Sequence, residues 1–114
     1  MDLRQTILDA PDLASETITV PEWNTSVIVS TMSGHARAAW ATVAFNADGK
    51  IIDENMRARL LIHCIVDENK VLVFHPDDAP ALENKNGDVI GRLFQIAKRL
   101  NGLGNDEVDN AEKK

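Results

Sequence analysis

Three histidines and one cysteine are the side chains of this chain best suited to metal binding or nucleophilic catalysis: His35, His63, His75 and Cys64. Neighbouring residues on a helix point about 100° apart, so His63 and Cys64 cannot easily face one metal ion. The sequence holds no Cys-x-x-Cys or His-Glu-x-x-His spacing. Burial of Cys64 in the apolar run around it would make the thiol a poor nucleophile. We therefore expect no metal site and no thiol catalysis, with Cys64 in the core and His63 at its margin.

Paired carboxylates are the other candidates for catalysis. General acid–base chemistry needs such groups in a shaped cleft, but most of the pairs fall at predicted turns or helix caps. No glycine cluster is followed by the Lys-Ser or Lys-Thr of a phosphate-binding loop. The sequence therefore predicts a non-enzymatic protein that needs no cofactor. The pairs are Asp53–Glu54, Asp67–Glu68, Asp77–Asp78 and Asp106–Glu107.

Composition narrows the function further. A chain of 114 residues with 44% hydrophobic residues predicts one domain with a modest core. The net charge of −6 argues against binding to nucleic acid or to anionic membranes, which both attract basic proteins. A single cysteine fits a reducing cytoplasm. The sequence shows no secretory signal, and no apolar run approaches the roughly 20 residues of a membrane span.

Apolar alternation predicts a β-hairpin near the N-terminus, with Ile18 and Val20 on one strand and Val27 and Val29 on the next. Before it, residues 1–10 could form a weak helix with its leucines and isoleucine on one side.

After the hairpin, the apolar residues recur at helical spacing. Ser33 is a good N-cap for a helix to about Phe45, and a second helix is predicted from about Asp53 to Val66. The run Val71–Phe74 is of strand type, and either pairs with the hairpin or lies extended over the core. Further on we expect a short helix at Pro76 and a last helix, capped by Asn86 or Asp88, that ends at Gly102. The predicted fold is thus α+β: a mainly α-helical small domain over residues 1–104 with an N-terminal β-hairpin. Residues 105–114 are predicted to be a disordered polar tail that folding does not need.

Six residues are candidates for partner binding. Trp23, in the hairpin turn, either folds back on the core or is exposed as an anchor. Arg57 and Arg59 begin the second helix, where they either contact a partner or pair with surface charges. The remaining three would give the last helix a basic outer face in an acidic protein, a candidate surface for self-association: Arg92, Lys98 and Arg99.

Several short motifs occur in a characteristic order. They are Val20-Pro21-Glu22-Trp23 in the hairpin, an apolar helix flanked by arginines, the turn Val66-Asp67-Glu68, and the helix end Leu100-Asn101-Gly102-Leu103. Over about residues 13–104 this set resembles the tail assembly chaperones of long-tailed bacteriophages. The chain departs from the usual pattern at Asn24–Ser26, where many relatives have glycines, and at Asn69-Lys70, where many have Asp-Gly.

The resemblance implies a non-enzymatic phage tail assembly chaperone of the host bacterial cytoplasm, absent from the mature virion. Such proteins coat the hydrophobic, helical tape measure protein until tail tube subunits polymerise around it. They exist as a short product and as a longer one made by programmed ribosomal frameshifting, which recruits the tail tube protein. This chain would be the short, self-associating form, and Lys113-Lys114 is a candidate slippage site. The alternative function, from a different class, is a small regulatory or inhibitor protein that binds one folded host partner.

Overall fold

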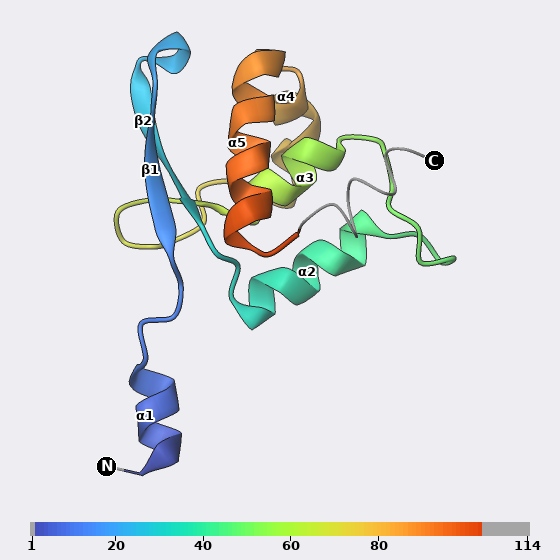
Figure 1. Cartoon of the computed structure of the whole chain (residues 1–114). Helices are drawn as coiled ribbons and strands as arrows, with labels where there is room; N and C mark the ends of the chain where they lie inside the picture. The colour runs from blue at the N-terminus through green and yellow to red at the C-terminus, as the bar shows by residue number, and fades with distance from the viewer. Residues whose placement is uncertain (1, 104–114) are drawn as a thin grey trace.

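A β-hairpin lies along one side of the fold, and the last helix, α5 (Gly87–Leu100), packs beside it (Figure 1). The structure is a computed structural model and describes residues 2–103. Strands β1 (Ser15–Val20) and β2 (Thr25–Ser30) pair antiparallel, and η1 (Pro21–Trp23) joins them at the tip. A short third strand, β3 (Ile65–Val66), pairs antiparallel with β2 and completes a sheet of order β1-β2-β3. The predicted α+β class with an N-terminal hairpin is therefore confirmed.

The helices follow the hairpin in the chain. Capping residues predicted from the sequence begin two of them: the Ser33 hydroxyl accepts from Ala36 N–H, and the Asn86 side chain accepts from the N–H groups of Asp88 and Val89. Gly102, with φ of +66°, follows the last helix as predicted. The elements are α1 (Leu3–Asp9), α2 (Gly34–Ala44), α3 (Met56–Ile62), η2 (Pro76–Asp78), α4 (Ala79–Glu83) and α5 (Gly87–Leu100).

The core lies between the sheet and helices α3 and α5. Val20, Val27 and Val29 supply one side, because alternate residues of each strand point to the same face. The apolar stripe of α5 supplies the other side, where Val89, Leu93 and Ala97 have no exposed surface. On α2, Trp40 packs edge-on against Phe45, with 5.5 Å between ring centroids. None of the helices within residues 2–103 has the length and apolar character required to cross a bilayer.

One predicted boundary is wrong. The helix expected to run to Val66 ends at Ile62, and the β-branched pair Ile65–Val66 joins the sheet instead. The carbonyl of Cys64 accepts from Ser30 N–H at 2.8 Å, so β2 competes successfully for this backbone. The run Val71–Phe74 takes neither predicted position in full: it makes one bridge, between Val66 and Leu72, and Val71, Leu72 and Val73 are exposed.

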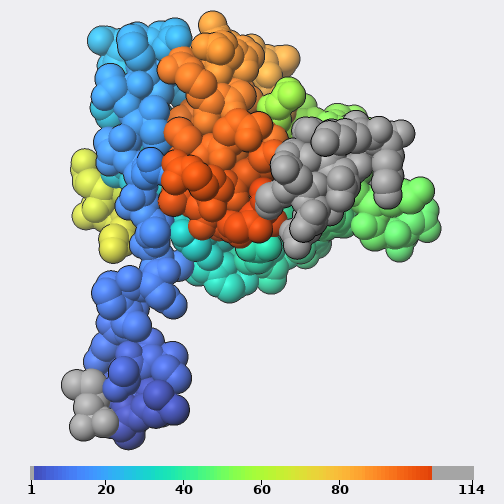
Figure 2. Space-filling view, viewed as in Figure 1, coloured from blue at the N-terminus to red at the C-terminus, as the bar shows by residue number. Residues whose placement is uncertain are grey.

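Helix α1 stands apart from the rest of the domain. It projects from the base of the hairpin and has no buried residue (Figures 1 and 2). The carbonyl of Ala14 accepts from Thr31 N–H at 2.8 Å, which fixes the chain where it enters β1. Residues 10–14 therefore join a detached helix to a fixed strand. The predicted tail, residues 105–114, lies outside the residues that the structure describes.

Candidate functional site

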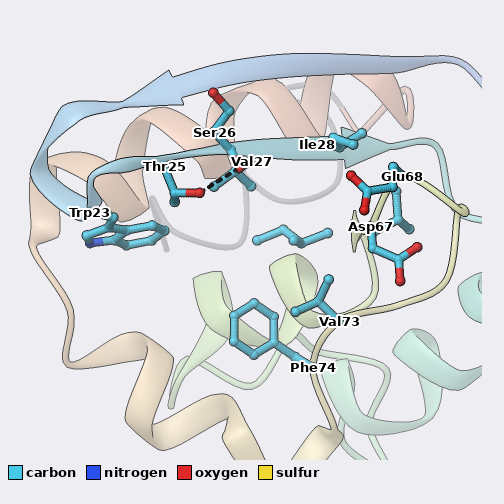
Figure 3. Close-up of a pocket in the computed structure, with 11 residues that line it drawn as sticks. Trp23, Thr25, Ser26, Val27, Ile28, Asp67, Glu68, Val73 and Phe74 are labelled. Carbon is cyan, nitrogen blue, oxygen red and sulfur yellow. Dashed lines mark hydrogen bonds between the residues drawn. The ribbon is translucent and has the colours of Figure 1, made fainter.

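An apolar groove runs along the free side of β2, and we call it the hairpin groove (Figure 3). Trp23 lies at one end, the carboxylates of Asp67 and Glu68 lie at the other, and Val73 and Phe74 face β2 from across the groove. Its volume is about 370 Å³. The groove is lined by Trp23, Thr25, Ser26, Val27, Ile28, Ile65, Val66, Asp67, Glu68, Val73 and Phe74.

A second hollow continues the hairpin groove beyond Phe74. The two share Trp23, Val73 and Phe74, and the second hollow adds a wall from α4 that includes Leu82, for a further volume of about 440 Å³. Sites that bind apolar ligands or helices are lined mainly by aromatic and aliphatic side chains, and these two hollows have such side chains in their lining.

The β2 backbone beside the groove is also unpaired. Strand β3 pairs only with Ile28 and Val29, so residues 25–27 have no neighbouring strand on the groove side within residues 2–103. Unpaired strand edges readily accept another chain. The hydroxyl of Thr25 donates to the carbonyl of Ser26 at 3.4 Å, a weak contact that leaves the edge uncovered (Figure 3).

Trp23, the predicted anchor, takes a position between the two predicted alternatives. Its ring packs partly against the core and partly lines the hairpin groove. The sharp turn that places it there ends at Asn24, which adopts a left-handed conformation with φ of 52°. The indole N–H is covered and finds no acceptor in the described part of the chain. A buried N–H without an acceptor costs free energy, because it has lost its hydrogen bond to water. An indole that moves when the groove is filled could form this hydrogen bond and recover the free energy.

Arg92 and Arg99 bind the hairpin of their own chain. A terminal nitrogen of Arg92 lies 2.7 Å from Glu22, and Arg99 pairs with Glu16 on β1. The pKa of Glu22 is lowered, first by a hydrogen bond from its own backbone N–H and then by Arg92. Both arginines are more than one third exposed, so each pair contributes little to stability. The two pairs connect η1 and β1 to α5, and the pair of Glu22 lies next to the Trp23 end of the groove.

The other basic candidates gather around Phe94. The Arg57 guanidinium lies 6.0 Å from the ring centroid and the Lys98 ammonium lies 5.3 Å from it, within cation–π range. Lys98 was predicted on an outer basic face, and that placement is wrong, because Lys98 is only 4% exposed. Arg59 is half-buried, and its Nη1 has no acceptor within residues 2–103.

The histidines and the cysteine considered for catalysis lie outside the groove lining, whereas the carboxylate pair Asp67–Glu68 lies at one end of it. Burial raises the pKa of the Cys64 thiol to about 12, so it is protonated at neutral pH. His63 is buried beside it, and its Nδ1 contacts the carbonyl of Arg59 at 2.7 Å. His75 instead caps η2 at the surface. Across the described residues, no three histidine, cysteine or carboxylate side chains gather as a metal site would require.

Sequence reasoning missed the hairpin groove as a site. Its walls come from residue 23, residues 25–28, residues 65–68 and residues 73–74, which only the tertiary fold brings together. The signal that could have pointed to it was the apolar run Val71–Phe74, which is too short and too exposed to be a core strand. The detached α1 likewise carried a visible signal in its one-sided Leu3, Ile7 and Leu8.

The whole described chain resembles one family of phage proteins. Residues 2–114 match the family model of the phage tail assembly chaperones. Among solved structures, that of the bacteriophage HK97 tail assembly chaperone is similar, with a TM-score of 0.59 and 26% sequence identity. The match covers 86% of this chain and 91% of that chain. No curated protein sequence matches. The chain therefore belongs to the phage tail assembly chaperone family.

Proposed function

We propose that this protein binds the tape measure protein of its phage, keeps it soluble, and helps to recruit tail tube subunits during tail assembly. Family membership carries this proposal, because it makes phage tail proteins the general class of partner. The family and the fold likewise suggest a non-enzymatic role, and we extend this to a protein without catalytic activity. Its place of action would be the host bacterial cytoplasm, and the mature virion would not contain it.

The surface of the domain supports this role. A tape measure protein is long, helical and apolar, so its chaperone must offer apolar surface while remaining soluble itself. The large exposed hydrophobic residues of residues 2–103 fall in only two places: the α1 arm, which is α1 with the linker of residues 10–14, and the loop beside the hairpin groove. Exposed apolar patches of this kind mark interaction surfaces. The net charge of −6 would keep an otherwise adhesive protein in solution.

Self-association is the second part of the proposal. One small domain covers only a short length of a long helical client, so many copies must act together. Recruitment of the tail tube protein would belong to the longer frameshifted form, whose extension lies outside this chain. The candidate residues Trp23, Arg57 and Arg59, together with Arg92, Lys98 and Arg99, remain predictions as partner contacts.

Binding to synthetic segments of the tape measure protein tests the proposal. Helical, apolar segments encoded by the same phage should bind the full chain in calorimetric titrations, with a negative heat-capacity change from apolar burial. Segments with the same composition and a scrambled order, which lose the apolar stripe, are the matched control. Equal binding to both, or to neither, would contradict the proposal. Tight binding to one folded host protein instead would favour the inhibitor alternative.

A further inference from the structure

We propose that the outer edge of β1 pairs antiparallel with the same edge of a second copy, about a two-fold axis at Thr17. This inference deepens the self-association part of the proposed function and rests on it only for its purpose. Within residues 2–103, β1 pairs with β2 alone, so its other edge is open over all six residues. Figure 2 shows β1, in blue, at the front surface of the molecule beside α5.

The register of the hairpin determines which backbone groups of β1 face this open edge. The Thr31 N–H donates to the carbonyl of Ala14 at 2.8 Å, so hydrogen-bonded pairs start there and recur at every second residue. The Ser30 N–H instead donates at 2.8 Å to the carbonyl of Cys64, on the opposite side of β2, as this alternation requires. The residues of β1 that turn their N–H and C=O groups away from β2 are therefore Ser15, Thr17 and Thr19.

The open edge lacks the features by which proteins usually prevent pairing. Such features include lysines, prolines and bulges on the edge strand. Strand β1 reads Ser-Glu-Thr-Ile-Thr-Val, and its register with β2 is unbroken. Its one charged side chain, Glu16, pairs with Arg99 of α5. Threonine, isoleucine and valine also favour strands, so this edge suits a further strand.

The same edge of a second copy is complementary to it. With Thr17 opposite Thr17, the Ser15 of each copy lies opposite the Thr19 of the other. Every outward residue then faces an outward residue, and each of these three pairs exchanges two hydrogen bonds. A shift of the register by two residues would leave one outward residue of each copy without a facing residue. The register centred on Thr17 therefore satisfies the most backbone groups.

Side chains and charges also fit this register. The three outward residues are exposed on one face of the sheet, where hydroxyl groups of the two copies can hydrogen-bond across the axis. On the other face, Glu16 of each copy lies opposite Ile18 of the other copy. Arg99 neutralises Glu16 in both copies, so the contact brings together no unpaired like charges.

Pairing of this kind closes after two copies. Both copies use the same surface, so the contact is isologous and leaves no further β1 edge open. The hairpin groove lies on the β2 side of the sheet, and the α1 arm leaves the base of the hairpin, so neither is consumed by the contact (Figures 1 and 3). Such a pair offers a long helical client twice the apolar surface of one domain.

Disulfide cross-linking of full-length variants tests the inference. Cys64 is the single native cysteine, and burial raises the pKa of its thiol to about 12, so it does not react at neutral pH. In Thr17→Cys, the two Cα atoms at the axis would be about 5.5 Å apart, within the range for a disulfide. Under mild oxidation this variant should form a covalent dimer roughly tenfold or more faster than Thr42→Cys, whose thiol is exposed on α2.

A mixture of two variants tests the register. Ser15→Cys and Thr19→Cys chains should cross-link with each other when mixed, because the two residues face each other across the axis. Each variant alone should cross-link no faster than Thr42→Cys, since its two thiols lie more than about 13 Å apart. All of these sites are exposed, and circular dichroism verifies that the variants are folded.

Two charge variants in the Thr17→Cys chain test the part played by Arg99. Arg99→Glu leaves Glu16 without its cation and should slow cross-linking by roughly threefold or more, within the modest range of exposed ion pairs. Arg92→Glu is the matched control. It makes the same change of charge on the same helix, but Arg92 pairs with Glu22, beyond the end of β1, so the rate should not change.

Several results would overturn the inference. These are a Thr17→Cys chain that cross-links no faster than Thr42→Cys, a mixture of the Ser15 and Thr19 variants that cross-links no faster than its components, or equal slowing by the two arginine variants. The outcome is separable from that of the proposed function: segments of the tape measure protein can bind an unpaired chain, and the β1 edges can pair without such binding.

Discussion

Asn101 joins the end of α5 to the start of α2, and its removal should cost far more stability than its size suggests. Its side chain is 8% exposed. The Oδ1 atom accepts from the N–H of Met32 at 2.6 Å, and Nδ2 donates to the carbonyl of Ala97 at 2.9 Å. Nδ2 also lies 3.5 Å from the sulfur of Cys64. The perturbation is Asn101→Ala, which removes both functional groups of the amide.

The magnitude follows from the groups that remain. The Met32 N–H would be buried without an acceptor, which costs about 1–3 kcal/mol. Loss of the bond from Nδ2 adds about 1 kcal/mol. The carbonyl of Ala97 keeps the backbone N–H of Asn101 as a donor at 3.1 Å, so it adds no further penalty. The expected loss in the free energy of unfolding is therefore about 2–4 kcal/mol.

Guanidinium denaturation measures this loss, and Asn46→Ala is the matched control. The Asn46 side chain also accepts two backbone N–H bonds, from Asp48 at 2.9 Å and from Lys50 at 3.1 Å, but in an exposed turn. Water can replace it there, so the control should lose about 1 kcal/mol or less. Equal losses in the two variants would refute the reasoning, because they would show that burial of the Met32 N–H is not what makes Asn101 important.

Three further predictions concern the core, the thiol and the hairpin contacts. Leu93→Ala should cost about 2–5 kcal/mol in denaturant melts, and a loss below about 1 kcal/mol would place this stripe outside the core. The pKa of the Cys64 thiol is raised from 9.0 to about 12 in the folded chain. The contribution of the thiol to the free energy of unfolding is therefore complete below pH 9 and is lost as the pH rises toward 12. The stability advantage of wild type over Cys64→Ala should shrink by about 1.4 kcal/mol per pH unit in that window, and a constant advantage would contradict the shift. Arg92→Ala should lower stability far less than Leu93→Ala, because its ion pair with Glu22 is exposed. This loss should disappear at high salt, and also as the pH falls from 4.5 through the lowered pKa of Glu22. A loss that depends on neither salt nor pH would show that the ion pair is not its cause.

Local signals predicted much of this fold. The hairpin, the caps at Ser33 and Asn86, and the glycine after α5 depend on residues close in sequence, and the structure confirms them. The end of α3 could not be predicted in this way. Residues 63–66 have enough helical spacing to continue the helix, and they leave it because β2, more than thirty residues earlier in the chain, offers hydrogen bonds.

The site was less predictable than the fold. Trp23 was identified as a candidate, but its partners in the groove come from distant segments that periodicity cannot place. Lys98 was assigned to the surface from its charge, although it is buried and its ammonium lies over the ring of Phe94. The exposed residues of α1 follow the pattern of an ordinary amphipathic helix, and only the tertiary structure reveals that its apolar face covers no other part of residues 2–103.

Co-expression with the tape measure protein of the same phage tests the central claim most directly. The measurement is the fraction of the tape measure protein in the soluble part of the cell extract, with and without this chain. The proposed chaperone function predicts a largely soluble tape measure protein that co-purifies with several copies of the full chain. A tape measure protein that stays insoluble, or that is equally soluble without this chain, would contradict it.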